Sequence, residues 1–200
     1  MLYAIAEDGT KILPAYSGQH AICPGCRGEV IARCGRINIW HWGHVSGVDC
    51  DTWAEPLSLW HLQWQSYLAQ QGAEIEVTME RGGTTHRADA VLKNGTVVEL
   101  QHSSISVDEI EKREKFYGNL IWIFDAIDAY EKDRFDLRMK EGYQTFRWKH
   151  ARKSIAHASK PVRLDLGDGW IMNLKKMSKD SPCGGWGVIK FVPGVSVENA

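Results

Sequence analysis

Two short β-prone runs joined by Asn94-Gly95 constrain the fold of this chain more than any other feature. The first run is His86–Leu92, and the second is Val97–Gln101. An Asn-Gly pair between such runs favours the tight turn of a β-hairpin, so the two runs are predicted to pair as antiparallel strands. A charged helix is then expected over Val107–Asn119, followed by a short apolar strand over Leu120–Phe124.

The hairpin carries an acidic and amide pattern that is typical of a cation site. Asp89 lies in the first strand, and Glu99 and Gln101 lie in the second. Side chains alternate along a strand, so Glu99 and Gln101 point the same way, and Asp89 joins them if it faces that side. Close carboxylates repel unless a cation lies between them, and such oxygen ligands suit Mg²⁺ or Mn²⁺. Taken alone, the spacing also occurs in ordinary surface hairpins.

The apolar neighbours of Glu99 favour the metal interpretation. Val97, Val98 and Leu100 make the second strand hydrophobic nearly throughout. A carboxylate in such a strand is expected to be buried, where an unpaired charge costs several kcal/mol or takes up a proton. A metal ion or a cationic partner is the usual remedy.

Cysteines and histidines near the N-terminus predict a zinc site. The Cys23-Pro-Gly-Cys26 turn points two sulfurs at one ion, and His41-Trp-Gly-His44 and then Cys50 follow. Zinc takes four ligands and five candidates are present, while Cys34 is less well placed. The ion is expected to be structural, because this segment has little core of its own. We expect the ligands to be Cys23, Cys26, His44 and Cys50, with His41 as the alternative to Cys50.

Composition excludes several classes of protein. The chain has 200 residues, 44% hydrophobic and 24% charged, with a net charge of −1, so it is not a globally basic nucleic-acid binder. No apolar run approaches membrane-helix length, and no signal peptide is visible. Five cysteines, two of them in a Cys-x-x-Cys, favour a reduced, cytoplasmic protein over a disulfide scaffold.

Taken together, the motifs resemble those of the competence protein CoiA-like nucleases, over roughly residues 20 to 125. Both the Cys and His cluster and Trp60-His61-Leu62 resemble parts of that family, its zinc module and its middle helix. The resemblance implies a PD-(D/E)XK nuclease fold in which Glu99-x-Gln101 stands where that fold has Glu-x-Lys. It is further carried by His86-Arg-Ala-Asp-Ala, Val-Glu-Leu-Gln-His-Ser-Ser-Ile-Ser, the spaced Glu109, Arg113 and Tyr117, and Leu120-Ile-Trp-Ile-Phe-Asp125.

The resemblance also implies roles for individual residues. Asp89, Glu99 and the main-chain carbonyl of Leu100 would hold Mg²⁺ or Mn²⁺, and Gln101 would orient the attacking water. His61 and Glu55 are further candidate catalytic residues. The chain departs from the family pattern there, because the family carries an acidic residue nearer the histidine and a Lys where Gln65 stands.

The expected activity is that of a metal-dependent deoxyribonuclease, an endonuclease rather than an exonuclease, with DNA as partner and no organic cofactor. A non-catalytic nucleic-acid-binding module on a nuclease fold is the alternative, and a zinc-organised interaction domain is a third hypothesis. Arg113 could reach a phosphate or bind a carboxylate. A basic stretch with an aromatic residue can follow a nucleic-acid backbone or simply be a solvated face. The stretch contains Arg147, Trp148, Lys149, His150, Arg152 and Lys153, of which Lys149, Arg152 and Lys153, with Arg113, are the candidate DNA contacts.

We expect an α+β fold with a restriction-endonuclease-like αβββαβ core and a small N-terminal β-rich zinc-binding module. The expected parts are the module over 1–52, the core over 53–130, and a β-rich C-terminal extension of the core over 131–200. A helix is predicted over Trp53–Gln71, and a strand over Ala73–Glu80 with Ile75, Val77 and Met79 on one face. Further strands are expected at Gln144–Trp148, Val162–Leu166 and Trp170–Leu174, and the last residues are expected to be loose.

Overall fold

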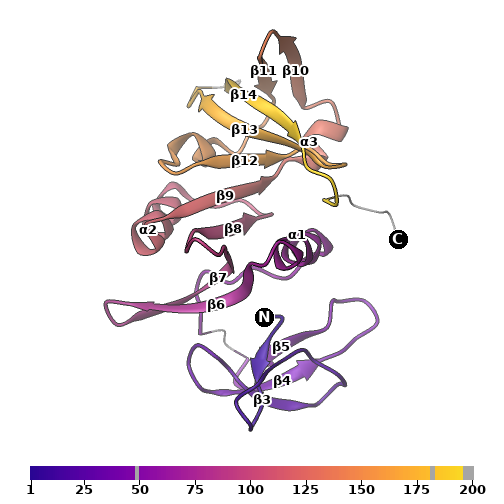
Figure 1. The fold of residues 1–200 in the computed structure, drawn as a ribbon, viewed down its shortest axis with the longest axis vertical. Coiled ribbons are helices and arrows are strands. Elements are labelled where there is room, and N and C mark those ends of the chain that lie inside the picture. The colour runs from indigo at the N-terminus through magenta and orange to yellow at the C-terminus, as the bar shows by residue number, and fades with distance from the viewer. Residues whose placement is uncertain (48–49, 181–182, 196–200) are drawn as a thin grey trace.

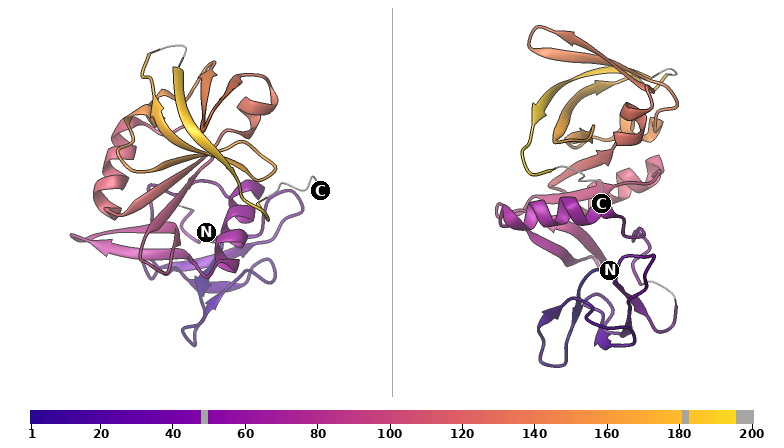
Figure 2. Two further views of the ribbon diagram at one scale, coloured as in Figure 1. Left: turned by 45° about the horizontal axis from the view of Figure 1, so that its top comes forward. Right: turned by 90° about the vertical axis from the view of Figure 1, so that its right-hand side faces the viewer.

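The computed structural model describes residues 1–47, 50–180 and 183–195, which form two β-sheets with few helices (Figures 1 and 2). The smaller sheet is antiparallel, in the order β2-β1-β3-β4-β5, and belongs to the N-terminal part. It encloses a small core around Val30 and Trp42. Its strands are β1 (Ala4–Ile5), β2 (Lys11–Ile12), β3 (His20–Ile22), β4 (Glu29–Arg33) and β5 (His41–His44).

The larger sheet has nine strands in the order β10-β11-β14-β13-β12-β9-β8-β7-β6, and it is mixed because β9 is parallel to both β8 and β12. The described helices are α1 (Leu59–Gln70), α2 (Val107–Tyr117), the short α3 (Ile127–Glu131) and the 3₁₀ helix η1 (Lys153–His157). The strands are β6 (Glu74–Arg81), β7 (Thr84–Val91), β8 (Val97–Gln101), β9 (Leu120–Asp125), β10 (Phe135–Lys140), β11 (Tyr143–Trp148), β12 (Val162–Asp165), β13 (Trp170–Met177) and β14 (Cys183–Phe191).

Helices α1 and α2 cover opposite faces of the sheet, as the alternation of β8 requires. Val98 and Leu100 pack in one core cluster with Trp64 of α1, whereas Val97 packs in another with Ile110 of α2. Both faces of β8 are therefore buried, which explains why its sequence is apolar nearly throughout. The predicted order of helix, three strands, helix and strand is present from α1 to β9.

Helix α1 begins later than predicted. It starts at Leu59 rather than at Trp53, because Ser58 is its N-cap and the Ser58 side chain accepts a hydrogen bond from the backbone N–H of His61. Its end was predicted correctly, since Gly72, with φ +82°, follows the C-cap. The six residues before the cap form a loop, and this loop carries Glu55 toward β8.

The predicted common face of Ile75, Val77 and Met79 is wrong. Ile75 packs with α1, whereas Met79 packs against the cluster on the other face of the sheet. Glu76 lies between them with φ +49°, a left-handed conformation that interrupts strand alternation. The β6–β7 ladder accordingly continues from Ile75–Ala90 to Val77–Ala88 without a Glu76–Asp89 pair.

The C-terminal extension continues the larger sheet, since β12 lies beside β9. Asp165 joins it to α1 by accepting hydrogen bonds from the indole N–H groups of Trp60 (2.8 Å) and Trp64 (2.7 Å). The predicted strands at 144–148, 162–166 and 170–174 correspond to β11, β12 and β13, whereas β10 and β14 were missed. The prediction of loose final residues concerns 196–200, which lie outside the described residues. Of the helices described, none combines the length and apolarity needed to cross a membrane.

Candidate functional site

The candidate site lies where β7 and β8 diverge. Their registered pairs are Ala90–Val98 and Val91–Val97, next to the Asn94-Gly95 turn. Beyond them, the Asp89 carboxylate takes the place of a backbone partner and accepts a hydrogen bond from the N–H of Leu100 at 2.8 Å. Asp89 and Glu99 line the same cavity of about 30 Å³. A space of that size accommodates about two water-sized groups, but not a nucleotide.

Burial dominates the electrostatics of the two carboxylates. It raises the pKa of Asp89 to about 7, against the hydrogen bond from Leu100. Burial, and then the neighbouring Asp89 carboxylate, raise the pKa of Glu99 to about 8, although the guanidinium of Arg113 opposes this. The two acids therefore hold protons more tightly than exposed ones, and a cation in the cavity would reverse that preference.

Arg113 compensates only one oxygen of Glu99. Its Nη1 donates to Glu99 Oε2 at 2.9 Å, and its Nη2 donates to the carbonyl of Trp53 at 3.0 Å. Glu99 Oε1 is buried without a hydrogen-bond partner among the residues that the structure describes. A buried acceptor without a partner needs a physical explanation, and a bound cation or water supplies one.

Gln101 and Glu55 meet beside the cavity. The amide nitrogen of Gln101 donates to Glu55 Oε1 and, at 3.2 Å, to the carbonyl of Ser103. The amide oxygen Oε1 of Gln101 is buried and has no hydrogen-bond partner within the described ranges. The loop before α1 thus brings Glu55 to the end of β8, 46 residues away in the chain.

His61 reaches the same strand end from α1. Its Nε2 lies 3.2 Å from the carbonyl oxygen of Leu100, and its Nδ1 lies 2.9 Å from the hydroxyl of Ser58. Burial lowers the pKa of His61, so the ring is neutral near pH 7. When the neutral ring donates from Nε2 to the Leu100 carbonyl, its Nδ1 accepts a hydrogen bond from the Ser58 hydroxyl. These two hydrogen bonds fix the orientation of the ring. Gln65, one turn further along α1, is buried with both amide atoms unpartnered among the described residues.

Sequence reasoning missed Glu76, which also lines the carboxylate cavity. Its side chain is 4% exposed, and its two oxygens accept hydrogen bonds from the backbone N–H groups of Leu2 (2.7 Å) and Tyr3 (2.9 Å). Glu76 therefore connects the N-terminal part to the large sheet. The available signal was the one used for Glu99: a carboxylate between apolar neighbours, here Ile75 and Val77.

The side chains of the basic stretch 147–153 differ in burial and in what they contact. Trp148 is 3% exposed and packs in the core, so it cannot serve as an exposed aromatic partner. Lys149 and Lys153 are exposed on the surface. Arg152, by contrast, turns toward the carboxylate site, where its Nη1 lies 3.2 Å from the carbonyl oxygen of Ser103. Arg152 is thus the one cation of the stretch that is hydrogen-bonded at the candidate site among the described residues.

The cysteine and histidine cluster forms as predicted, with all its ligand atoms within 4.8 Å of one another. Backbone N–H groups donate to two of its sulfurs, Gly25 to Cys23 (3.4 Å) and Gly28 to Cys26 (3.3 Å). Such bonds stabilise thiolates, the form of cysteine that binds metal. A metal such as zinc can bind this cluster, which consists of Cys23, Cys26, His44 and Cys50.

The alternative ligand His41 lies outside the cluster, and its Nδ1 is 2.8 Å from the carbonyl oxygen of Ile39. Cys34 also lies outside it and packs against the N-terminal core. Burial and the neighbouring thiols raise the pKa of Cys50 to about 12. Three sulfurs this close therefore need a cation before all can be thiolates.

Two protein-family models match the chain. Residues 10–52 match the model of the competence protein CoiA N-terminal domain, and residues 61–160 match that of the competence protein CoiA nuclease-like domain. The first match contains the cysteine and histidine cluster, and the second contains Asp89 and Glu99. Searches of the curated proteins and of the solved structures each returned no significant match.

Proposed function

The chain belongs to the competence protein CoiA family, and from that premise we propose that it is a Mg²⁺- or Mn²⁺-dependent nuclease that hydrolyses phosphodiester bonds of DNA. The nuclease-like domain supports a function on nucleic acid. One observation carries the finer proposal: Asp89 and Glu99 line one cavity, and Glu99 Oε1 is buried without a partner among the described residues. We propose endonucleolytic rather than exonucleolytic cleavage.

Asp89, Glu99 and the carbonyl of Leu100 would hold the divalent ion, since Mg²⁺ and Mn²⁺ take oxygen ligands of these kinds. When bound, such an ion lowers the pKa of water and polarises the phosphate. His61 orients the Leu100 carbonyl through its Nε2. These residues come from β7, β8 and α1, so the sheet and the helix fix their relative positions.

Gln101 has a positioning role in this proposal. Its amide nitrogen is engaged by Glu55, which leaves the amide oxygen to accept a hydrogen bond from the attacking water. An amide carries no charge, so it cannot stabilise the transition state as a Lys would, but it can orient the nucleophile. Arg152, next to Ser103, would contact a phosphate beside the site, and the exposed Lys149 and Lys153 are further candidate DNA contacts.

For the N-terminal cluster we propose one structural Zn²⁺ held by Cys23, Cys26, His44 and Cys50. Thiolate and imidazole ligands suit zinc, whereas Mg²⁺ prefers oxygen, so the two metal sites are chemically separable. Four protein ligands would close the coordination shell and leave no position for substrate. Three thiolates also require reducing conditions, which is consistent with our expectation of a cytoplasmic protein.

A non-catalytic nucleic-acid-binding module is the second candidate, and the Arg113–Glu99 ion pair favours it. That pair supplies a cationic partner to the carboxylate, so the fold can bury Glu99 without a metal ion. This candidate predicts salt-dependent DNA binding without cleavage. Calorimetry discriminates the two: Mn²⁺ binding that is lost in Asp89→Ala supports the nuclease, and absence of Mn²⁺ binding supports the module.

The deciding experiment is digestion of single-stranded and double-stranded DNA by the full chain with Mg²⁺, Mn²⁺ or EDTA. The wild type is expected to cut with a divalent ion and not with EDTA. Glu99→Ala should abolish cleavage while zinc content stays unchanged. Glu111→Ala is the matched control, because Glu111 is an exposed acid on α2. Equal cutting by wild type and Glu99→Ala would exclude this site as the catalyst, and no cutting of either substrate would exclude the nuclease.

A further inference from the structure

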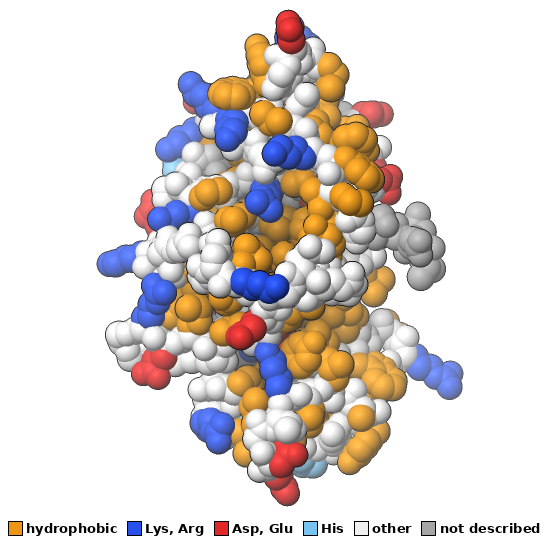
Figure 3. Space-filling view, viewed as in Figure 1, with side chains coloured by type: hydrophobic (Ala, Val, Ile, Leu, Met, Phe, Trp, Pro, Cys, Tyr) orange, Lys and Arg blue, Asp and Glu red, His pale blue; other side chains and the backbone are white. Residues whose placement is uncertain are grey.

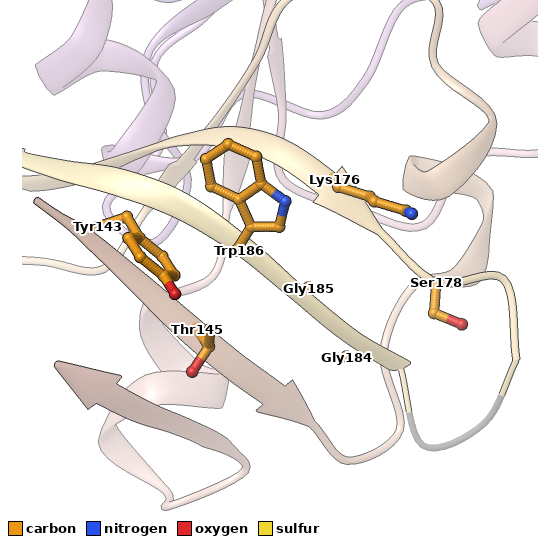
Figure 4. A pocket seen from close by; sticks show the side chains of 7 residues that line it. All are labelled: Tyr143, Thr145, Lys176, Ser178, Gly184, Gly185 and Trp186. Carbon is orange, nitrogen blue, oxygen red and sulfur yellow. The ribbon is translucent and has the colours of Figure 1, made fainter. Parts of the chain in front are cut away.

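A second hollow lies on the C-terminal half of the large sheet, lined by residues other than those of the carboxylate cavity (Figure 4). Its volume is about 610 Å³, within the range of about 300–1,000 Å³ usual for ligand sites. Trp186 and Tyr143 stand on neighbouring strands, and Lys176 lies on the other side of Trp186 (Figure 4). The lining residues are Tyr143, Thr145, Lys176, Ser178, Gly184, Gly185 and Trp186, here called the β11–β14 groove.

The groove occupies the exposed face of a half-buried sheet. Phe146 and Cys183, on the same two strands, point into the core. Alternation then directs Tyr143 and Trp186 to the opposite face, where each is 40% exposed. Their rings meet edge to face at a centroid distance of 5.8 Å. Large aromatic side chains held in the open in this way are typical of binding surfaces rather than of a solvated sheet.

Cations flank these rings in register. The backbone register places Arg138 of β10 opposite Thr145 of β11. It also places Thr145 opposite Trp186 of β14, and Trp186 opposite Lys176 of β13. This row across four strands therefore has a positively charged side chain at each end. In the next rows Lys140 pairs with Tyr143, and Arg147 lies between Asp136 and Gly184. Asp136 carries the one carboxylate in these rows, and its Oδ2 lies 3.7 Å from Nε of Arg138. Lys and Arg side chains also lie among hydrophobic ones in the upper part of Figure 3, the part formed by these strands.

We propose that the β11–β14 groove binds a single-stranded segment of nucleic acid, with bases on Trp186 and Tyr143 and phosphates at Lys176 and Arg138. The local positive charge, in a chain of net charge −1, complements a phosphate backbone. Every base has a flat face that stacks on an aromatic ring, whereas a duplex keeps those faces inside. The arrangement therefore favours a single strand over a duplex.

This inference rests on the proposed function for the nature of the partner, but not on the cleavage chemistry. Trp186 and Lys176 lie beyond residue 160, where the family match ends, so the match assigns them no role. If the chain is a nuclease, the groove would hold a part of the DNA strand that is cut at the carboxylate site. If the chain does not cut DNA, the groove would bind single-stranded nucleic acid without cleavage. The two outcomes are separated by measuring binding and cutting independently.

The test is fluorescence anisotropy of labelled (dT)₁₂ with the full zinc-loaded chain and no added Mg²⁺ or Mn²⁺, alongside the matching dA·dT duplex. Wild type should bind the single strand more tightly. Trp186→Ala should weaken that binding about 5- to 150-fold, the equivalent of about 1–3 kcal/mol for one stacked base, and Trp186→Phe should recover most of it. Lys176→Gln should reduce the slope of log K against log salt by about 0.7. Trp170→Ala is the matched control, because Trp170 is 48% exposed but does not line the groove.

The inference is overturned if wild type does not bind (dT)₁₂, or if Trp186→Ala and Trp170→Ala bind it equally well. Tighter binding of a polyglutamate peptide than of (dT)₁₂ would also overturn it, in favour of an acidic protein partner. Glu99→Ala separates the two proposals. If it loses cleavage while Trp186 proves irrelevant to binding, the nuclease stands without this groove. If nothing cuts while Trp186→Ala still weakens binding, the groove stands without the nuclease.

Discussion

The guanidinium Nη1 of Arg113 lies 2.9 Å from Oε2 of Glu99, and both side chains are buried between α2 and β8. Arg113 thus touches the candidate metal ligand rather than solvent. Of the two sequence-based options for Arg113, carboxylate binding is the one that the geometry favours over contact with a phosphate. The positive charge of Arg113 lowers the free-energy cost of burying Glu99 when no metal ion is bound.

Arg113→Ala is expected to destabilise the metal-free protein by about 3–5 kcal/mol, because it leaves the buried carboxyl group of Glu99 without its cationic partner. Mn²⁺ should restore part of that loss, since the ion can replace the missing positive charge. Urea unfolding with and without Mn²⁺ measures both effects. Lys112→Ala, an exposed cation one residue earlier on α2, is the control. Equal stability of Arg113→Ala and Lys112→Ala without added Mn²⁺ would contradict the structural role.

The carboxylate pair makes stability depend on pH in the metal-free protein. The folded-state pKa values of Asp89 and Glu99 are raised to about 7 and 8, so their contribution is present below their ordinary values near 4 and is lost as pH rises through 7 to 8. Wild type should therefore lose stability relative to Glu99→Gln between about pH 4 and pH 8, by on the order of a few kcal/mol, and the difference should level off above pH 8. Urea unfolding of both proteins without added Mg²⁺ or Mn²⁺ measures the difference. A difference that does not change with pH would argue against buried, proton-holding carboxylates.

Zinc removal should affect the N-terminal part first. Cys26→Ser is expected to lose the ion and to unfold roughly residues 1–50, because binding at such sites contributes on the order of 10 kcal/mol to folding. Cys34→Ser should retain the ion, since Cys34 lies outside the cluster. Elemental analysis after purification without chelators measures zinc per chain, and limited proteolysis reports the unfolding. Less than half a zinc per wild-type chain would refute the assignment.

Glu76→Ala should detach the start of the chain from the large sheet. Each hydrogen bond to the charged carboxylate contributes about 1.5–3 kcal/mol, and Glu76 accepts one from Leu2 and one from Tyr3. Hydrogen exchange of a peptide covering residues 1–5 should accelerate, measured by mass spectrometry. Glu74→Ala, an exposed acid two residues earlier on β6, should leave that exchange unchanged. The connection assigned to Glu76 would be wrong if both variants exchanged alike.

Local patterns predicted the elements whose formation depends on neighbouring residues. Asn94-Gly95 predicted the β7–β8 hairpin, and Gly72 predicted the end of α1. The Cys23-x2-Cys26 turn predicted one half of a metal cluster, which the fold completes with His44 and Cys50. Each of these depends on a turn or a cap, which is chemistry within a few residues of chain.

Contacts between residues far apart in the chain could not be predicted from local sequence patterns. Trp148 was expected beside exposed cations, but it is in the core, because β11 turns that side chain toward the α2 face. The start of α1 was placed too early, since the apolar pattern of the helix continues into a loop that Ser58 separates from it. Strand β14 was not predicted at all, because its glycines give little β propensity and its pairing to β11 and β13 supplies the stability.

By itself, the sequence determined the types of side chain available for chemistry and their local positions: Asp89, Glu99 and Gln101 on the hairpin, and Cys23 and Cys26 in their turn. Only the tertiary structure decided which distant groups join them. It brought Glu55, His61, Glu76 and Arg113 to the same strand ends. The reason is physical: alternation and turn geometry act over a few residues, whereas a buried carboxylate takes its partner from whichever element the packing of the whole sheet places against it.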